Sequence, residues 1–220
     1  MTTIAIVGAG PNLGLAVARR FAREGFAVAL LARNQARLDD LSATLRSDGH
    51  TAEGFTTDVR DTDSLRGALD AAAQRLGPIE VLQYSPLPAK EFMRPVLETT
   101  AADLIGPVEL SIYGSVTATS RVIPGMRTLG RGTILFINGA SAVKPRDEVT
   151  GTSIAFAGES AYAHLLHDAL AADGIHVGQL IIPQGIGGGD PAHEPTALAD
   201  TLWNIHTDRG EFRTFVTPLD

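Results

Sequence analysis

Short apolar runs alternate with amphipathic stretches along the whole chain. The first run, Thr3–Val7, ends at a glycine, and apolar residues then recur at helical spacing over residues 13–25. This alternation predicts strands at residues 3–7, 26–32, 50–58, 79–84, 132–138, 174–183 and 211–218. It predicts helices at residues 13–25, 35–49, 61–76, 100–127, 153–173 and 196–207. We therefore expect a doubly wound α/β fold with a mostly parallel seven-stranded sheet and helices on both faces.

The composition narrows the class of protein. With 220 residues, 44% of them apolar, the chain is long enough for one well-buried domain over residues 1–220 and too short for two. The net charge of −7 argues against a basic nucleic-acid groove, and the lack of cysteine excludes disulfides and thiolate sites. No apolar run approaches ~18 residues and the chain opens directly on a strand, so we expect a cytoplasmic protein that binds no membrane.

A glycine-rich turn connects the first predicted strand to the first predicted helix. It contains Gly8, Gly10 and Gly14. Glycines at this place let backbone N–H groups approach a pyrophosphate, and the helix N-terminus adds partial positive charge. The turn is therefore predicted to bind a dinucleotide, as in a single Rossmann-type domain. The alternative is a glycine-rich turn that binds no ligand.

The residues after the second predicted strand favour one form of the cofactor. NAD sites usually place a carboxylate here to bind the ribose hydroxyls, whereas this chain has Arg33 and Asn34. A guanidinium pairs well with a 2′-phosphate, so we predict NADP(H) rather than NAD(H). In the alternative interpretation, Arg33 is a solvated side chain on a loop.

These features resemble the short-chain dehydrogenase/reductase family, and the resemblance covers nearly the whole chain. The family's opening motif, TGxxxGxG, aligns with Val7–Gly14, where Asn12 replaces the middle glycine. Asparagine tolerates left-handed backbone better than other non-glycine residues, so the turn is expected to survive the replacement.

The resemblance implies a role for each part of the cofactor site. Gly8, Asn12 and Leu13 would border the pyrophosphate and Arg33 the 2′-phosphate, while the residues after the third strand would border the adenine. The residues expected to bind NADP(H) are Gly8, Gly10, Pro11, Asn12, Leu13, Gly14, Arg33, Asn34, Asp58, Val59, Ser85 and Pro183.

The residues that carry the family's chemistry are missing. No tyrosine is followed four residues later by a lysine, so the family's YxxxK pair is absent. In the matching helix, Ala155 or Phe156 takes the place of the tyrosine and Glu159 or Ser160 that of the lysine. A phenol titrates near ~10 and needs a neighbouring ammonium to exchange protons at neutral pH, so the family's usual mechanism cannot operate unchanged.

Other replacements affect the remaining family residues. The family's catalytic serine aligns with Gly139 and its helical asparagine with Ser111. Three side chains near the expected site are candidates for the missing proton donor: Ser141 after the fifth strand, Tyr84 at the end of the fourth, and Tyr113 on the fourth helix.

Each candidate group has a second interpretation. The tyrosine at position 84 could be a core aromatic, the serine at position 141 a turn former, and Lys144, the only lysine near the expected site, a solvated side chain. His164 and His167 stand at a spacing that could hold a metal, but the sequence indicates no third ligand, and we expect no metal.

Three functions remain open. The first is an NADP(H)-dependent oxidoreductase with a non-standard proton donor, acting on a small organic carbonyl or alcohol. The apolar, proline-rich loop at residues 86–95 favours an uncharged substrate, and the glycine-rich segment at residues 183–195 suits a lid. The second is a non-catalytic NADP(H)-binding sensor or partner subunit. The third is a protein that has lost the cofactor and acts through its surface.

We also expect a homodimer or homotetramer. The predicted helix at residues 153–173 is broadly apolar and has many small residues, which suits close packing against a second copy.

Overall fold

The computed structural model describes residues 1–219. Seven strands form one sheet in the order β3-β2-β1-β4-β5-β6-β7, and all six neighbouring pairs are parallel. The strands are β1 (Thr3–Val7), β2 (Ala27–Ala32), β3 (Ala52–Thr56), β4 (Ile79–Tyr84), β5 (Gly132–Gly139), β6 (Ile175–Ile182) and β7 (Arg213–Phe215). This arrangement confirms the predicted α/β fold.

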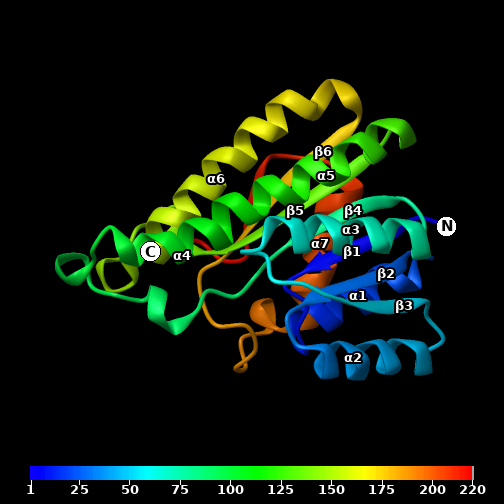
Figure 1. Ribbon diagram of the computed structural model, residues 1–220, viewed down its shortest axis with the longest axis horizontal. Coiled ribbons are helices and arrows are strands. Elements are labelled where there is room, and N and C mark those ends of the chain that lie inside the picture. The colour runs from blue at the N-terminus through cyan, green and yellow to red at the C-terminus, as the bar shows by residue number, and fades with distance from the viewer. Residues whose placement is uncertain (220) are drawn as a thin grey trace.

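Helices cover both faces of the sheet. They are α1 (Leu13–Arg23), α2 (Gln35–Ser47), α3 (Thr62–Leu76), α4 (Ile105–Val108), α5 (Gly114–Leu129), α6 (Thr150–Leu170) and α7 (Pro195–Asp208). Figure 1 shows α5 and α6 on one side of the sheet and α1 and α2 on the other. The helices α3, α5 and α6 share one hydrophobic cluster with the sheet, while α1, α2 and α7 share a second.

The alternation of side chains along each strand produces these two clusters. In β1, Ile4 and Ile6 face α1, whereas Ala5 and Val7 face the other layer, and all four are fully buried. Burial on both faces explains why the strands are continuous apolar runs, as parallel sheets covered by helices require.

The long helix predicted over residues 100–127 is interrupted. A 3₁₀ turn (Ala102–Leu104) leads into α4, and a π-helical turn, Glu109–Tyr113, separates α4 from α5. The Tyr84 hydroxyl donates a hydrogen bond to the Leu110 carbonyl inside this turn, so that carbonyl serves a tertiary contact. π-Helical turns of this kind occur frequently at functional sites.

The last predicted strand, residues 211–218, is also shorter than expected. Pairing with β6 ends at Phe215, and Val216 then donates its N–H to the Ile181 carbonyl at 3.1 Å. Pro218 has no N–H to continue a ladder, so the chain leaves the sheet here.

The strand order determines where a ligand can bind. The chain runs outward from β1 to β3 on one side and from β4 to β7 on the other, so the order reverses between β1 and β4. In open α/β sheets, ligands bind at the carboxyl ends of the strands beside such a reversal. The glycine turn after β1 and the residues after β4 lie at this point.

Candidate cofactor and active site

The glycine turn is held tightly against its neighbours. Gly8 has φ +90°, and both Gly8 and Ala9 donate their N–H groups to the Leu31 carbonyl on β2, at 2.9 and 3.0 Å. A Cβ added to Gly8 would lie 2.6 Å from the Ser85 carbonyl oxygen, which no real Cβ tolerates. Glycine is therefore required here for both backbone conformation and packing.

The outer side of the same turn is open. A Cβ added to Gly10 would meet no atom within 4 Å. The N-cap residue of α1, Asn12, makes no side-chain capping hydrogen bond, so the first N–H groups of the helix lack that partner. An open turn with uncapped amides at a helix N-terminus fits a pyrophosphate.

Asn12 does not adopt the left-handed conformation considered from the sequence. Its φ is −90° and its ψ −102°, so the residue at this position is not in the left-handed region that favours glycine. Pro11 and Asn12 line a groove with the N-terminal residues of α7, and Leu13 and Gly14 are buried in the first turn of α1. The helix α1 therefore still begins directly after the turn, although Asn12 replaces one glycine of the motif.

Arg33 and Asn34 differ in what they do in the structure. The Asn34 side chain caps α2, because its Oδ1 accepts the Arg37 N–H at 2.9 Å. Arg33 is exposed directly after β2, and it makes no ion pair with the described residues. Its guanidinium is therefore available at the sheet edge for an anion.

The remaining cofactor candidates lie along the same edge. Asp58 follows β3 and accepts the Arg60 N–H at 3.0 Å, and Val59 beside it is buried. Ser85, directly after β4, accepts a hydrogen bond from the Gln83 side-chain amide at 2.8 Å and donates its N–H to the Val7 carbonyl of β1. Pro183 follows β6 directly. The fold thus brings these predicted residues to one edge of the sheet.

The three catalytic candidates lie in different environments. Tyr84 is 0% exposed and its hydroxyl already donates to the Leu110 carbonyl, while burial, Glu159 and Asp58 raise the pKa of its phenol well above 10. Tyr113 is 57% exposed at the end of the π-helical turn. Ser141 lies on a 3₁₀ turn (Ala140–Ala142) directly after β5, and no hydrogen bond to another described residue occupies its hydroxyl.

A buried acid that was not among the candidates lies at the centre of this region. Glu159 on α6 is 2% exposed, and its carboxyl accepts a hydrogen bond from the Asn138 side-chain amide at 2.9 Å and another from the Ser111 hydroxyl. Burial raises the pKa of Glu159 to about 8, although both hydrogen bonds oppose that rise. The signal in the sequence was an acid in a largely apolar part of the helix, at one of the two positions that align with the family's lysine.

The Asn138 amide is part of a longer hydrogen-bonded series. Gln179 on β6 donates its side-chain N–H to the Asn138 Oδ1 at 2.8 Å. The Gln179 Oε1 in turn accepts from Arg213 Nε at 2.8 Å and from the Ser160 hydroxyl at 3.0 Å. We call the series Arg213–Gln179–Asn138–Glu159 the amide relay. It connects β7, β6, β5 and α6.

The histidines of α6 have local partners. His164 stacks on Phe212 with ring centroids 4.7 Å apart, and His167 Nδ1 is 2.7 Å from the Val177 carbonyl oxygen. Among residues 1–219, no group of three or more His, Cys, Asp or Glu side chains is arranged to hold a metal ion. None of the described helices has the length and apolar character needed to cross a bilayer.

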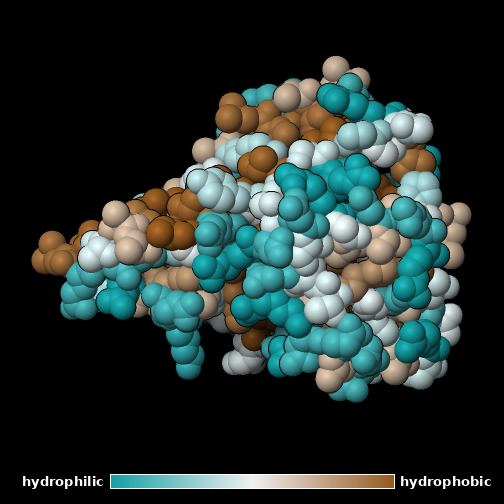
Figure 2. Space-filling view, in the orientation of Figure 1, coloured by the Kyte–Doolittle hydropathy of each residue, from teal (hydrophilic) through white to brown (hydrophobic). Residues whose placement is uncertain are grey.

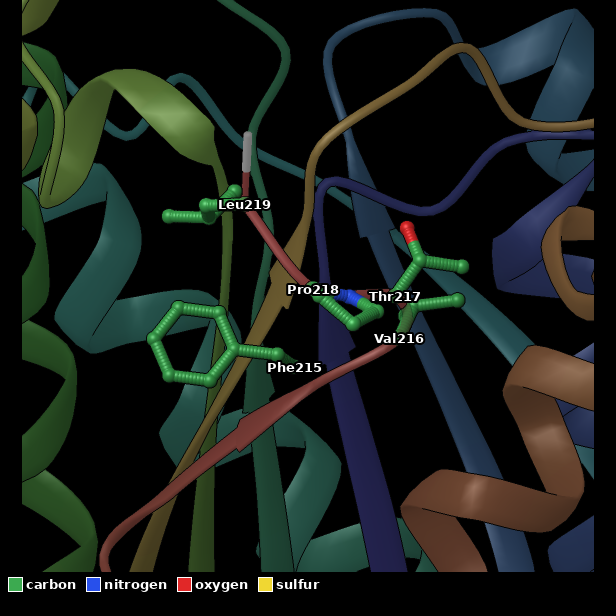
Figure 3. A pocket seen from close by; sticks show the side chains of 5 residues that line it. All are labelled: Phe215, Val216, Thr217, Pro218 and Leu219. Carbon is green, nitrogen blue, oxygen red and sulfur yellow. The ribbon is translucent and has the colours of Figure 1, made fainter.

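The segment after β7 lies beside the same sheet edge. Figure 3 shows the side chains of Phe215–Leu219, which line a shallow hollow. The volume of this hollow is about 340 Å³. Its lining is apolar apart from Thr217, whose Oγ1 is buried without a hydrogen-bond partner. The hydrogen bond from Val216 to Ile181 fixes the segment at the carboxyl end of β6.

The chain was compared with families and with known proteins. A family model described as short chain dehydrogenase matches residues 2–187. A 3-dehydrosphinganine reductase of Arabidopsis thaliana is 28% identical over 184 residues, covering 81% of this chain and 54% of that protein. A cis-4-hydroxycyclohexanecarboxylate dehydrogenase of Sinomonas cyclohexanicum is 28% identical over 172 residues, covering 78% of this chain and 68% of that protein. The chain spans only about half, or less, of several other curated relatives.

Solved structures give the same fold. A short-chain dehydrogenase from Rhodopseudomonas palustris is 26% identical in sequence, and its structure matches with a TM-score of 0.87. The match covers 99% of this chain and 99% of that one. A short-chain oxidoreductase from Pseudomonas aeruginosa, described as containing an atypical catalytic center, is 18% identical with a TM-score of 0.87 and covers 98% of this chain and 95% of that one. At that identity the likeness concerns the fold alone.

Proposed function

Because the chain belongs to the short-chain dehydrogenase family, whose members are NAD(P)-dependent oxidoreductases, we propose that it uses NADP(H) to interconvert a small organic carbonyl and its alcohol, with a proton donor other than the family's tyrosine. The observation that carries this proposal is the glycine turn after β1. Its inner side is required for packing and its outer side is open, with uncapped amides. This open side lies at the start of a helix and beside the reversal of strand order, where a phosphate group would meet the helix N–H groups.

The residues present fit a phosphorylated dinucleotide. The amides around Gly10 would bind the pyrophosphate, and Arg33 would pair with the 2′-phosphate. A dinucleotide bound across the reversal between β1 and β4 would extend toward β3 on one side and toward β4 and β5 on the other. When bound, a nicotinamide supplies or accepts hydride; the protein orients the reacting groups and handles the proton.

Among the catalytic candidates, Ser141 is the best placed to contact a substrate. It lies after the carboxyl end of β5, and its hydroxyl is available to hydrogen-bond a carbonyl or alcohol oxygen. The Tyr84 hydroxyl is already engaged with a backbone carbonyl, so it supports the π-helical turn rather than a substrate. Tyr113 is exposed, and its role as a proton donor stays a prediction.

The shallow, open hollow beside β6 offers apolar surface for an uncharged organic substrate to contact. It is lined by the side chains of Phe215, Val216, Pro218 and Leu219, with Thr217 Oγ1 as one polar atom that lacks a partner. Apolar walls with few polar groups are typical of sites for small organic molecules. A screen of aldehydes and ketones for NADPH consumption would identify the carbonyl compound.

Titration with NADPH and NADH tests the cofactor proposal. In the Arg33→Ala variant, the affinity for NADPH should fall by about 10- to 100-fold, because a charge-assisted hydrogen bond contributes about 1.5–3 kcal/mol. Its affinity for NADH, which lacks the 2′-phosphate, should not change. Arg37→Ala is the matched control, since Arg37 is also exposed at the start of α2. Equal affinity of wild-type protein for the two cofactors, or an Arg33→Ala variant that binds NADPH normally, would contradict the proposal.

A second function is supported by the buried residues at the family's catalytic positions. Neither Ala155 nor Phe156, which align with the family's tyrosine, has a hydroxyl, and neither Glu159 nor Ser160, which align with its lysine, carries a positive charge; all four are buried. These residues favour a non-catalytic NADP(H)-binding sensor or partner subunit. NADPH that binds but is not consumed with a broad panel of aldehydes and ketones would favour this second function.

We further propose a homodimer formed through α6. Ile154 and Leu165 on this helix are exposed, at 48% and 69%, and Val116 on α5 is 38% exposed. Figure 2 shows hydrophobic surface gathered over α6. Packing against a second copy would cover these side chains. Sedimentation of a species of twice 23.1 kDa would support this assembly, and a Leu165→Glu variant should then sediment as a monomer.

A further inference from the structure

The amide relay has a single direction. The Arg213 guanidinium donates to the Gln179 oxygen, the Gln179 amide donates to the Asn138 oxygen, and the Asn138 amide donates to Glu159. Each amide therefore presents its oxygen toward the guanidinium and its N–H toward the carboxyl. Hydrogen bonds arranged in this way polarise one another. The positive charge of Arg213 on β7 therefore strengthens the hydrogen bond that Asn138 donates to Glu159, although two neutral side chains separate the two charged groups.

The Glu159 end of the amide relay reaches the sheet edge where the proposed cofactor would bind. Asn138 is the penultimate residue of β5, which pairs with β4, and β4 pairs with β1 at the reversal. A dinucleotide whose phosphates lie on the turn at Gly10, and whose 2′-phosphate lies at Arg33, must extend its nicotinamide half toward β4 and β5. That half would then lie on the side of the sheet edge where Glu159 is buried.

We propose that Glu159 is a proton store linked to the charge of the nicotinamide: it holds a proton beside the neutral, reduced ring and releases it when the ring is oxidised and positive. This inference rests on the proposed function, since it requires that NADP(H) binds. The amide relay is the device that lets a fully buried carboxyl exist in both protonation states.

The physical balance between these states follows from the contacts. Burial without a direct ion pair favours the neutral acid, and the hydrogen bonds from Asn138 and Ser111 favour the carboxylate. An oxidised nicotinamide adds one positive charge nearby and so favours the carboxylate further. Each hydride that a carbonyl carbon accepts requires one proton on its oxygen. Release by Glu159 offsets the proton that the substrate oxygen takes up and leaves a negative charge opposite the new positive one.

The other charged and titratable groups around Glu159 do not replace it in this role. Tyr84 on β4 interacts electrostatically with Glu159, and its pKa is raised well above 10, so it stays protonated. Arg213 on β7 stays charged and acts through the two amides. Glu109, on the π-helical turn with Ser111, is paired with Arg60 at 2.7 Å. Glu159 is therefore the group of this set that can change charge near neutral pH.

The test measures the affinities of the protein for NADP⁺ and for NADPH between pH 6 and pH 9.5. Both cofactors carry the same phosphates, so the ratio of their affinities cancels phosphate ionisation. If Glu159 is the proton store, the ratio should shift in favour of NADP⁺ by about threefold or more as pH rises through the titration of the acid. Calorimetry in two buffers of different ionisation enthalpy should show proton release with NADP⁺ and less with NADPH.

The Glu159→Gln variant keeps the size of the side chain and its ability to accept from Asn138, but it cannot ionise. Its affinity ratio should not change with pH, and the excess proton release with NADP⁺ should disappear. Arg213→Gln removes the charge at the far end of the amide relay without touching the site. Its affinity ratio should change at a higher pH than that of the wild-type protein.

The outcomes separate this inference from the proposed function. If neither NADP⁺ nor NADPH binds, the proposed function fails first. If both bind and their affinity ratio in wild-type protein is constant over this pH range, the proton store is refuted while NADP(H) binding stands. The wild-type measurement alone decides this, even if a variant fails to fold. A Glu159→Gln protein that retains the pH dependence would assign the titration to another group and would also refute the inference.

Discussion

Gly8 and Gly10 lie two residues apart and allow packing to be separated from ligand binding. A methyl group on Gly8 would lie 2.6 Å from the Ser85 carbonyl oxygen and 2.7 Å from the Pro86 Cα, and the residue would keep φ +90°. A methyl group on Gly10 would meet no protein atom within 4 Å. The variants Gly8→Ala and Gly10→Ala therefore add the same atoms to one turn with opposite steric consequences.

The expected effects differ in size and in kind. Left-handed backbone costs an alanine about 1–2 kcal/mol, and moving the end of β4 away from the new methyl adds a similar amount, for a total of about 2–4 kcal/mol. For a chain of this length that corresponds to a fall in Tm of about 4–15 °C for Gly8→Ala. The Gly10→Ala variant should have the same Tm as the wild-type protein. If a pyrophosphate lies against the turn, however, the same methyl should weaken NADPH binding about tenfold or more, because it occupies the space of the phosphate.

Thermal unfolding by circular dichroism and NADPH titration by calorimetry would measure both effects. A Gly10→Ala protein with wild-type stability and wild-type NADPH affinity would refute the assignment of this turn as the phosphate site. A Gly8→Ala protein with unchanged Tm would show that the turn can move away from β4 at little cost, and the steric reasoning would be wrong.

Two further predictions concern stability. Tyr84→Phe should lower the free energy of unfolding by about 1–3 kcal/mol in urea titrations, because the Leu110 carbonyl loses its buried partner; a change below about 0.5 kcal/mol would mean that the hydrogen bond contributes little. Burial, and then the neighbouring His167, Arg209 and His206, lower the pKa of His176 to about 4. Below pH 6.5 the unfolded chain therefore binds more protons than the folded one. The free energy of unfolding should fall as the pH is lowered from 6.5 to 5. His176→Gln should reduce that slope, and an unchanged slope would assign it to other groups.

The fold could be predicted from the sequence because each strand carries its own signal. The strands at residues 3–7 and 79–84 were predicted residue for residue, since buried parallel strands are continuous apolar runs ended by turn residues. The glycine turn after β1 and the exposed Arg33 after β2 could be located in the same way, because each depends on neighbours in the sequence. Their roles in binding a cofactor stay predictions.

The features that the sequence did not reveal depend on contacts between distant residues. The π-helical turn accommodates a hydrogen bond from Tyr84 to Leu110, and nothing in the local pattern of residues 100–127 indicates it. The sequence indicates Glu159 only as an acid in a largely apolar part of a helix, at one of the two positions that align with the family's lysine. Its partners come from β5 and from the π-helical turn. Two catalytic candidates, Tyr84 and Ser141, were chosen by their place at or after the end of a strand, and Tyr113 by its place near Ser111 on the fourth helix. Neither criterion detects a buried acid in the middle of a different helix.

The parallel sheet has a practical consequence for work with this protein. β1 begins at Thr3, so Met1, which is 75% exposed, lies at the amino edge of the sheet. The segment after β7, which donates the Val216 N–H to the Ile181 carbonyl near the end of β6, lies at the opposite, carboxyl edge. A label attached near Met1 would lie at the edge of the sheet opposite the hollow at Phe215–Leu219 and would leave the carboxyl edge clear. Binding measurements are best made on protein labelled at the amino edge of the sheet.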